Sequence, residues 1–528
     1  MQNNKLLTKN SLFELLSKRF CEGEKKLSHI PNPTLLQDGE KSAKKIAQAI
    51  QNGKKITLVG DYDVDGVSST AIMVDFFRQI PYPLTTIIPN RFNDGYGVSP
   101  NVLQRVDADL VITVDNGITA IEAGEICKQR GIDLIITDHH TPSDKLPDAF
   151  SIIDPKLSTC SYPFKEICGA QVAWLLLALV KKELNLNIDM KQFLDILAIA
   201  IIADVMPLVD INRAMVKAGL KLLSHSTRPS SIIIRDFLNK SVITSEDIGF
   251  NIAPRLNSAG RLEDASLALS FLTAKDTHTA YTIFEKLSQL NENRKEIEAQ
   301  TTQEAMLQVD ENDKVIVVAG DDWHEGVVGI VASRLTDKFL KPAIVLSINN
   351  GIAKGSARSI GEVNIYNLIK ENETFLQKFG GHKMAAGLSL KVEDVEEFKK
   401  AINKTANNID EKDFIPKEYI TGVLPTDEID FELLDILQQF EPYGEGNLKP
   451  RFLMEDADII SIKPLGKEKL HSKIEIRQFS HERKTVELLL FRTLLEMPED
   501  KKLKCSYTVS KNEFNGRVSV QLLVNKVY

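Results

Sequence analysis

The sequence has no uninterrupted apolar run long enough to cross a membrane. Its longest apolar stretch, Leu194–Ala203, contains Asp195 and is far shorter than the roughly 20 residues that a spanning helix needs. The first residues, Met1–Thr8, lack the continuous apolar segment of a secretory signal. We therefore expect a protein that is neither inserted in a membrane nor secreted.

Cysteine is scarce, with five residues in a chain of 528 and no pair spaced as Cys-x-x-Cys. An odd number of widely spaced cysteines argues against a disulfide framework and against a structural zinc site. A reducing, cytoplasmic compartment is therefore expected.

An excess of basic charge is also missing, because the formal net charge is -8. A chain of this charge is not expected to bind nucleic acid over its whole surface. It is still compatible with a nucleic-acid enzyme, since an acidic metal site and a separate basic channel can exist in one molecule.

The composition is otherwise that of an ordinary globular protein, with 43% hydrophobic and 26% charged residues. The length favours three or four domains, and we find no internal repeat. Between residues 55 and 155, apolar runs alternate with helix-like segments. This alternation predicts an α/β domain with a parallel sheet.

Three aspartates follow the first predicted strand of this domain. The apolar run Ile56–Val59 leads to Asp61, Asp63 and Asp65. In an extended chain, residues two apart face the same way, so these carboxylates would lie on one side. Like charges this close repel unless cations lie among them, and Mg²⁺ and Mn²⁺ prefer oxygen ligands. A solvated acidic turn is the alternative; an EF-hand loop is disfavoured because its twelfth position, usually Glu, is Ile72.

Two further apolar runs end in side chains that can bind metals. The first leads to Asp115 and the second to the sequence Asp138-His139-His140. Ligands of an open parallel sheet bind beyond the carboxyl ends of its strands, where all three clusters would meet. Asp204, at the end of a predicted apolar helix, is a further candidate, although a role in capping the next turn would also explain it.

Arginines among glycine, proline and asparagine residues are candidates for phosphate binding, because the guanidinium group offers a planar donor fork. Arg91 lies in a loop after the predicted strand 85–88, and Arg255 and Arg261 lie in the segment 252–262. A plain polar surface is the alternative for each of them.

A long helix is predicted from about Asp276 to Gln308, where apolar residues recur at helical spacing. It would reach about 45–50 Å at 1.5 Å per residue. Its middle, residues 291–296, is almost wholly polar, which is typical of a helix that bridges two domains and is solvated midway.

A second α/β domain is predicted after this helix. Its strand-like and helix-like runs contain the motifs Gly355-Ser356-Ala357-Arg358 and Gly380-Gly381-His382. Paired glycines allow a ligand to approach the backbone closely. Arg358 and His382 are therefore candidates for gripping a phosphate or a base.

The last part of the chain changes to short β-type runs, after a linker predicted at residues 406–418. Five or so strands, with a hairpin turn at Asn515-Gly516, indicate a small β-barrel such as an OB-fold. Barrels of this kind are common platforms for single-stranded nucleic acid.

Together these motifs resemble the DHH phosphoesterases. The core motifs are Asp61-x-Asp63-x-Asp65-Gly66, Asp115-Asn116-Gly117, Asp138-His139-His140 and Ala203-Asp204. The Gly380-Gly381-His382 motif resembles that of the domain that accompanies the DHH core. Within the superfamily, the segments 254–261 and 322–330 are similar to the RecJ family of single-strand-specific exonucleases.

The resemblance implies both a fold and an activity. The fold is α/β, with a parallel-sheet DHH core joined by a long helix to a second α/β domain, followed by a small OB-like β-barrel. The activity is 5′→3′ exonuclease hydrolysis of single-stranded DNA with Mn²⁺ or Mg²⁺, in recombination and repair, with two ions in the site. Expected partners are single-stranded DNA, a single-strand-binding protein and a helicase, and the chain is expected to be a monomer.

The resemblance also implies roles for individual residues. The implied metal ligands are Asp61, Asp63, Asp65, Asp115, His139, His140 and Asp204, and all except Asp61 are also implied to be catalytic. The residues implied to hold the terminal phosphate or the DNA are Arg91, Arg255, Arg261, Ser356, Arg358 and His382. One departure is Val59, where many DHH phosphatases carry a histidine, so one metal ion would be less fully ligated.

Four domains are expected. They are residues 1–240 (DHH core with an N-terminal helical extension), 241–312 (connecting segment and long helix), 313–405 (DHH-associated domain) and 415–528 (OB-like domain). Two other functions stay open: a DHH phosphoesterase acting on short oligonucleotides or nucleoside bisphosphates, and a catalytically inactive DNA-binding relative. The first would need neither the barrel nor the long helix, and loss of metal positions would favour the second.

Overall fold

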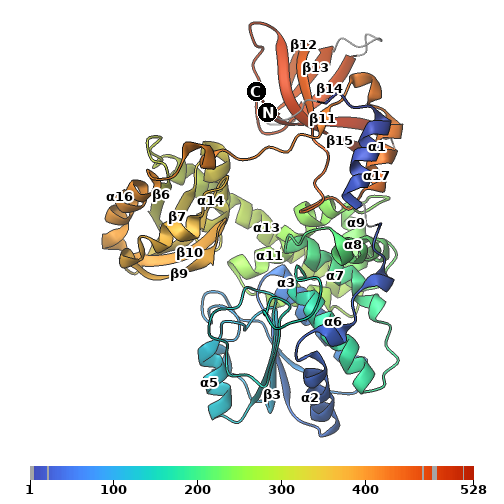
Figure 1. Cartoon of the computed structure of the whole chain (residues 1–528), viewed down its shortest axis with the longest axis vertical. Coiled ribbons are helices and arrows are strands. Elements are labelled where there is room, and N and C mark those ends of the chain that lie inside the picture. Colours follow the sequence, from blue (N-terminus) through green and yellow to red (C-terminus); the bar gives the residue numbers. More distant parts are fainter. Residues whose placement is uncertain (1–4, 21–22, 467–468, 478–484, 515–516) are drawn as a thin grey trace.

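The computed structural model describes residues 5–20, 23–466, 469–477, 485–514 and 517–528. A core domain lies at one end of the molecule, a β-barrel lies at the other end, and a second α/β domain lies to the side (Figure 1). Helix α13 (Thr277–Met306) connects the core to the second α/β domain. The predicted hairpin turn at 515–516 lies outside the described residues. Within them, no helix combines the length and apolarity needed to cross a bilayer.

Five parallel strands form the sheet of the core, in the order β2-β1-β3-β4-β5. They are β1 (Ile56–Val59), β2 (Thr85–Ile87), β3 (Leu110–Val114), β4 (Asp133–Thr137) and β5 (Ser151–Ile153). The predicted parallel sheet is confirmed. The chain leaves β1 for β2 on one side and returns to β3 on the other, so the strand order reverses beside β1. Parallel sheets bind ligands at such a reversal, beyond the carboxyl ends of the strands.

Helices cover this sheet, and further helices of the core lie between the sheet and the barrel. They are α2 (Gly39–Gln51), α3 (Val64–Phe77), α4 (Pro100–Gln104), α5 (Ile121–Gln129), α6 (Gly169–Glu183), α7 (Leu194–Ala203), α8 (Asp210–Leu223), α9 (Pro229–Leu238), α10 (Ser245–Asp247), α11 (Ala253–Leu262) and α12 (Ser266–Leu272). Short 3₁₀ turns are η1 (Lys18–Phe20), η2 (Leu27–His29), η3 (Pro33–Leu35) and η4 (Met190–Phe193), and η5 (Ile248–Ile252) is a π-helix.

Helix α3 begins among the three aspartates. The one-sided arrangement that we predicted needs extended backbone through Asp65, but the helix begins at Val64. Asp63 caps it, because its Oδ1 accepts a hydrogen bond from the Gly66 amide at 3.0 Å. Aspartate is a preferred residue at this capping position. Helix capping therefore outweighs the extended geometry that the alternating aspartates suggested.

A mixed sheet of five strands, in the order β6-β7-β8-β10-β9, forms the second domain. Its strands are β6 (Ile316–Asp321), β7 (Ala343–Asn349), β8 (Ile352–Arg358), β9 (Leu376–His382) and β10 (Ala385–Lys391). Its helices are α14 (Val328–Phe339), α15 (Ile365–Lys370) and α16 (Val395–Ala406), with 3₁₀ turns η6 (Glu373–Phe375) and η7 (Val392–Asp394). Ala385 of β10 lies opposite both Arg358 and His382. These two residues therefore share one row across the sheet, roughly 10 Å apart.

The long helix α13 agrees with the prediction in length, with 30 residues that span about 45 Å. Its middle, residues 291–296, is not solvated on all sides, because Asn291 is buried, as is Glu298 just beyond it. Glu298 pairs with Arg294 on the same helix and with the Nε of Arg334 on α14, at 3.0 Å. The polar sequence reflects ion pairs with a neighbouring helix, so polarity alone did not indicate exposure.

Five strands close into the predicted small barrel, in the order β12-β13-β14-β16-β15 with β15 pairing back to β12, and the short β11 adds to β12 outside this ring. The strands are β11 (Gly422–Val423), β12 (Phe452–Leu465), β13 (His471–Arg477), β14 (Thr485–Leu490), β15 (Lys502–Phe514) and β16 (Arg517–Val527). Helix α17 (Phe431–Gln439) and the turns η8 (Glu411–Phe414) and η9 (Thr426–Glu428) precede the long strands.

The N-terminal segment packs on the barrel. Leu7 and, from helix α1 (Lys9–Ser17), Leu12 and Leu16 enter the hydrophobic core of the barrel. The Leu7 amide donates to the carbonyl oxygen of Val423 at 2.8 Å. Helix α2 instead packs on α6 in the core domain. The helical extension that we assigned to the first domain is thus divided between the two ends of the molecule.

Candidate metal centre and substrate cleft

Asp61, Asp63 and Asp65 stay together at the carboxyl end of β1, although α3 begins among them. Asp61 and Asp65 are buried. Asp65 accepts hydrogen bonds from the amides of Gly169 at 2.6 Å and Ala170 at 2.9 Å. These amides belong to the first turn of α6, where they have no partner within the helix and favour a negative charge. Helix α6 therefore fixes one carboxylate of the cluster.

Asp115 follows β3 and adopts a left-handed backbone conformation with φ of 63°. Gly169 packs directly against it, since a Cβ added there would lie 2.5 Å from the Cβ and Oδ1 atoms of Asp115. The side chain of the neighbouring Asn116 donates to the carbonyl oxygens of Val59 at 3.2 Å and Val114 at 2.9 Å. Gly169 and Asn116 thus fix the turn after β3, and the Asp115 side chain lies in the cluster.

His139 lies at the centre of the acidic residues. Its Nε2 is 3.2 Å from Asp115 Oδ1, 3.6 Å from Asp204 Oδ2 and 3.7 Å from Asp65 Oδ2. Asp204 reaches this point from the C-terminal end of α7. Side chains that are far apart in the sequence therefore meet around one imidazole nitrogen.

His140 is held by Asp138, whose Oδ1 lies 2.7 Å from the His140 Nδ1. Asp138 Oδ2 accepts a hydrogen bond from the Ile118 amide at 2.8 Å. On the other side of the ring, the Tyr96 hydroxyl lies 3.5 Å from His140 Nε2. This is the arrangement expected of an aspartate that orients a histidine from outside the metal ligands.

Three groups of side chains have donor atoms that all lie within 4.8 Å of one another. They are Asp61, Asp63 and Asp115; Asp65, His139 and Asp204; and Asp115, His139 and His140. The structure therefore brings all the predicted metal ligands into one cluster, in which Asp115 and His139 are shared. Val59, the departure from the expected motif, is buried in β1.

Burial and mutual repulsion disfavour free carboxylates in this cluster. Burial, followed by the neighbouring aspartates, raises the pKa of Asp61 and Asp115 well above the usual value. The same causes raise the pKa of Asp65 to about 6 and that of Asp204 to about 9. Burial lowers the pKa of His139 to about 3, so the imidazole is neutral, the form that binds metals. A cation among these groups would stabilise the charged carboxylates.

His140 behaves differently from His139. Burial opposes its charged form, but the hydrogen bond with Asp138 outweighs burial and raises the pKa of His140 to about 9. Conversely, burial opposes ionisation of Asp138, but the contact with His140 holds the pKa of that carboxyl below its usual range. In the absence of a cation, His140 is therefore a positively charged group beside the cluster.

Several donor atoms of the cluster have no other partner. Asp115 Oδ1, His139 Nε2 and Asp204 Oδ2 are buried and make no hydrogen bond within the described part of the chain. Buried polar atoms are normally paired, so these atoms indicate a missing ligand. Carboxylate oxygens with an imidazole nitrogen suit Mn²⁺ and, through the oxygens, Mg²⁺. The residues present therefore fit a divalent cation.

Arginines gather between the core and the second domain. Burial, followed by repulsion from Arg91 and from other guanidinium groups that include Arg358, lowers the pKa of Arg261 to about 10. Arg91 lies over the Tyr62 ring at 4.3 Å, and its Nε is buried without a partner among the described residues. Arg358 donates to Ser356 Oγ at 2.6 Å. An anion bound among these guanidinium groups would offset their repulsion.

Two predicted substrate contacts lie apart from this group. Arg255 lies over the Phe237 ring at 4.3 Å and donates to Ser288 Oγ at 3.2 Å, so it is engaged among the helices of the core. His382 is exposed at the end of β9, in the same row as Arg358. The structure does not bring Arg255 to the arginine group.

Asp154 is a candidate site residue that the sequence reasoning missed. It follows β5 at the same edge of the sheet, it is buried, and its Oδ2 has no hydrogen-bond partner among the described residues. Burial raises the pKa of Asp154 to about 7. A signal exists, because the two apolar residues Ile152 and Ile153 followed by a carboxylate repeat the pattern of β1 and β3. The run is so short that it does not stand out as a strand.

Comparison with known families gives a consistent pattern along the chain. Residues 55–201 match the DHH family N-terminal domain, residues 312–408 match the DHHA1 domain, and residues 420–526 match the RecJ OB domain. These three matches correspond to the core, the second α/β domain and the barrel (Figure 1).

Similar proteins are described as single-stranded-DNA-specific exonuclease RecJ. The protein of Bacillus subtilis is 36% identical over 507 residues, which cover 93% of this chain and 64% of that protein. The protein of Haemophilus influenzae is 34% identical over 542 residues, which cover 96% of this chain and 93% of that protein. The chain thus spans less than two thirds of the first relative and nearly all of the second.

Solved structures agree in fold over the whole chain. The crystal structure of RecJ from Thermus thermophilus in complex with Mn²⁺ has a TM-score of 0.83 at 27% identity, and the match covers 100% of this chain and 80% of that one. The complex of the same protein with Mg²⁺ has a TM-score of 0.78 at 26% identity, and covers 100% and 79%. The similar proteins were thus crystallised with divalent cations of the kind that the donor atoms suggest.

Proposed function

Because this chain belongs to the RecJ family of DHH proteins, we propose that it is a metal-dependent exonuclease that degrades single-stranded DNA from the 5′ end. It hydrolyses phosphodiester bonds, and its place is in DNA recombination and repair. The observation that supports this most is the convergence of carboxylates and His139 on atoms that lack any other partner among the described residues. All the metal positions are retained, which disfavours an inactive DNA-binding relative.

We assign the cation ligands from the groups that the side chains form. Asp61, Asp63 and Asp115 would hold one ion, and Asp65, His139 and Asp204 would hold a second, with Asp115 between the two groups. Mn²⁺ or Mg²⁺ bound there supplies positive charge that stabilises the phosphate oxygens during hydrolysis and makes water a better nucleophile. No serine or cysteine nucleophile is required.

The side chains of the protein itself bind and orient the substrate. Arg91, Arg261 and Arg358, with Ser356, offer donors to a terminal phosphate, and Tyr62 fixes the plane of the Arg91 guanidinium group. Asp138 orients the His140 ring beside the cluster, so His140 would contact a cation or a phosphate oxygen of the substrate.

We attribute the polarity to the arginines at the junction of the two domains. The second domain approaches the core closely, since the Phe92 and His324 rings are 5.5 Å apart and Arg261 donates to the Gly326 carbonyl oxygen at 3.1 Å. The arginines at this junction would hold the 5′ phosphate while the next phosphodiester bond reaches the cluster. A small-substrate phosphoesterase needs neither the barrel nor the long helix, so we do not favour that function.

The proposed function is tested with single-stranded oligonucleotides labelled at one end and incubated with Mn²⁺. A ladder of products should form when the 3′ end is blocked, and a block at the 5′ end should abolish it. The matching duplex should resist degradation. Degradation that starts at the 3′ end, or activity that persists in EDTA, would refute the proposal.

The remaining expectations concern the surroundings of the enzyme. A single-strand-binding protein and a helicase are proposed partners, because an exonuclease of this kind needs a continuous supply of single strand. A monomeric state and a cytoplasmic location stay predictions.

A further inference from the structure

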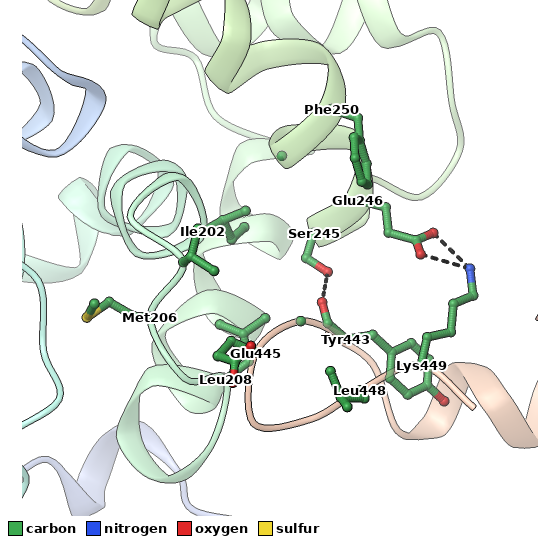
Figure 2. A pocket seen from close by; sticks show the side chains of 13 residues that line it. Ile202, Met206, Leu208, Ser245, Glu246, Phe250, Tyr443, Glu445, Leu448 and Lys449 are labelled. Atoms are coloured by element: carbon green, nitrogen blue, oxygen red, sulfur yellow. Dashed lines mark hydrogen bonds and ion pairs between the residues drawn. The ribbon is translucent and has the colours of Figure 1, made fainter. Parts of the chain in front are cut away.

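A pocket of about 230 Å³ lies where the core meets the segment that leads into the barrel (Figure 2). One wall carries Glu246 and Phe250, and the facing loop of residues 443–449 carries Tyr443, Leu448 and Lys449. The pocket is smaller than the about 300–1,000 Å³ that is typical of sites for whole small molecules. It has room for one flat ring system.

One side of this pocket is formed by the residues that end α7, next in the chain to a residue of the metal cluster. Val205 lines the pocket and directly follows Asp204, whose Oδ2 lies 3.6 Å from His139 Nε2. Val205 has φ of 55°, a conformation that is unusual for a β-branched residue. This backbone is the left-handed turn that ends α7, since the Met206 amide donates to the Ile201 carbonyl oxygen at 3.1 Å. The Val205 side chain is 65% exposed, so it lies open at the pocket.

The upper wall presents an aromatic ring to solvent. Phe250 is 79% exposed, and it belongs to the π-helix η5, a form of helix that is frequent at functional sites. Leu448, on the facing loop, is 44% exposed. Single exposed apolar residues are ordinary, but here Val205, Phe250 and Leu448 line one pocket.

The polar groups that line the pocket are already paired. Ser245 Oγ donates to the Tyr443 carbonyl oxygen at 2.6 Å, and the Glu246 carboxylate pairs with Lys449 Nζ at 2.8 Å (Figure 2). The Leu208 amide donates to the Glu445 carbonyl oxygen at 2.7 Å. A ligand in this pocket would therefore meet mainly apolar surface, with few donors or acceptors to read its identity.

We propose that this pocket receives one base of the single strand as the strand passes from the barrel to the metal cluster, with Phe250 as the stacking surface. The proposal rests on the proposed function, which supplies the strand. The position of the pocket supports this occupant, because Val205 at one side is the chain neighbour of Asp204 and the loop 443–449 at the other side leads to β12. Apolar walls accept any of the four bases, so the pocket holds the strand without selecting a sequence.

The test measures binding in EDTA, where the strand is not cut. Fluorescent single-stranded oligonucleotides carry one abasic site, moved stepwise from the 5′ end. For the wild-type protein, one position should weaken binding at least about fivefold, the lower end of what base–aromatic stacking contributes. Phe250→Ala should weaken binding of the intact strand by a similar factor and remove the sensitivity at that position. Phe250→Trp should restore both.

Tyr281→Ala is the matched control, because Tyr281 is an exposed aromatic residue on α13 that does not line the pocket. It should keep the affinity and the position-dependent profile. A flat abasic profile in the wild-type protein, or the same profile in Phe250→Ala, overturns the proposal while the product ladder from the 5′ end would still stand. A wild-type protein that neither binds nor cuts single strands overturns both proposals.

Discussion

At the scale of the residue, the cluster is defined by groups whose charges conflict in the absence of a cation. Asp61, Asp65 and Asp115 are buried together, and His139 is neutral between them. A protein rarely buries carboxylates without partners, because the desolvation of each charge costs free energy. The side chains of the cluster therefore favour the binding of a divalent ion.

Asp204 gives a prediction about pH. Burial and the neighbouring aspartates raise the pKa of Asp204 to about 9, so its contribution to the stability of the ion-free fold is present below about pH 4 and is lost as the pH rises towards 9. In EDTA at pH 8, Asp204→Asn should raise the melting temperature by about 2–4 °C, as expected for roughly 1 kcal/mol. The difference should vanish near pH 4.

With Mn²⁺ the wild-type protein should instead melt at a higher temperature than Asp204→Asn, because an ion bound to the folded state stabilises the wild-type protein more than a variant that lacks a ligand. Asp144→Asn, at an exposed carboxylate, should leave the melting temperature unchanged both in EDTA and with Mn²⁺. Thermal unfolding followed by circular dichroism, with and without Mn²⁺, gives both comparisons. A variant less stable than the wild type in EDTA at pH 8 would contradict the charge conflict.

At the scale of the element, the start of α6 organises two strand ends at once. Its first amides bind Asp65, and the missing side chain of Gly169 leaves space for Asp115. The N-terminus of this helix thus positions residues that follow β1 and β3. In this register of α6 against the sheet, Gly169 faces Asp115 directly, and a residue with a side chain would not fit there.

Gly169→Ala should displace Asp115, because the added Cβ would lie 2.5 Å from the Asp115 Oδ1. Loss of ligand positioning typically costs about 10–100-fold in metal affinity. Isothermal titration with Mn²⁺ should therefore show this loss, with a parallel loss of exonuclease activity. Gly387→Ala is the control, because a Cβ there would meet only the Gly355 carbonyl oxygen at 3.9 Å. Equal Mn²⁺ affinity in both variants would disprove the role of Gly169.

At the scale of the whole molecule, a buried cation joins the core to the segment before the barrel. Arg213 of α8 is 4% exposed and donates to the carbonyl oxygens of Phe440 at 2.8 Å and Pro442 at 3.3 Å. Its guanidinium group also lies 4.4 Å from the centre of the Phe20 ring, beside the N-terminal segment that packs on the barrel. Arg213 is therefore one of the contacts that orient the barrel on the core, together with the Ser245–Tyr443 and Glu246–Lys449 contacts.

Arg213→Ala should loosen this junction, since it leaves buried carbonyl oxygens without this donor. Hydrogen bonds from charged groups contribute about 1.5–3 kcal/mol. Calorimetry of the variant should then resolve separate unfolding transitions for the barrel and the core. The variant should also degrade long strands less processively than short strands. Lys217→Ala, on the same helix and half exposed, should leave a single transition. Unchanged cooperativity in Arg213→Ala would show that other contacts hold the barrel.

The sequence by itself determined the order of the domains and most of the chemistry. Apolar runs ending at Asp61, Asp115 and His139 predicted a parallel sheet with ligands at its carboxyl edge, because burial and strand direction are local properties of the sequence. The length of α13 and the closed barrel followed from periodicity in the same way.

Only the tertiary structure decided how those residues meet. Asp63 became a helix cap, Asp154 joined the edge of the cluster from an unrecognised strand, and Arg255 turned to Phe237 and away from the other arginines. The N-terminal helix packed on the barrel at the far end of the chain. Such outcomes depend on which surfaces pack together across hundreds of residues. The free energy of that packing cannot be inferred from a local sequence pattern.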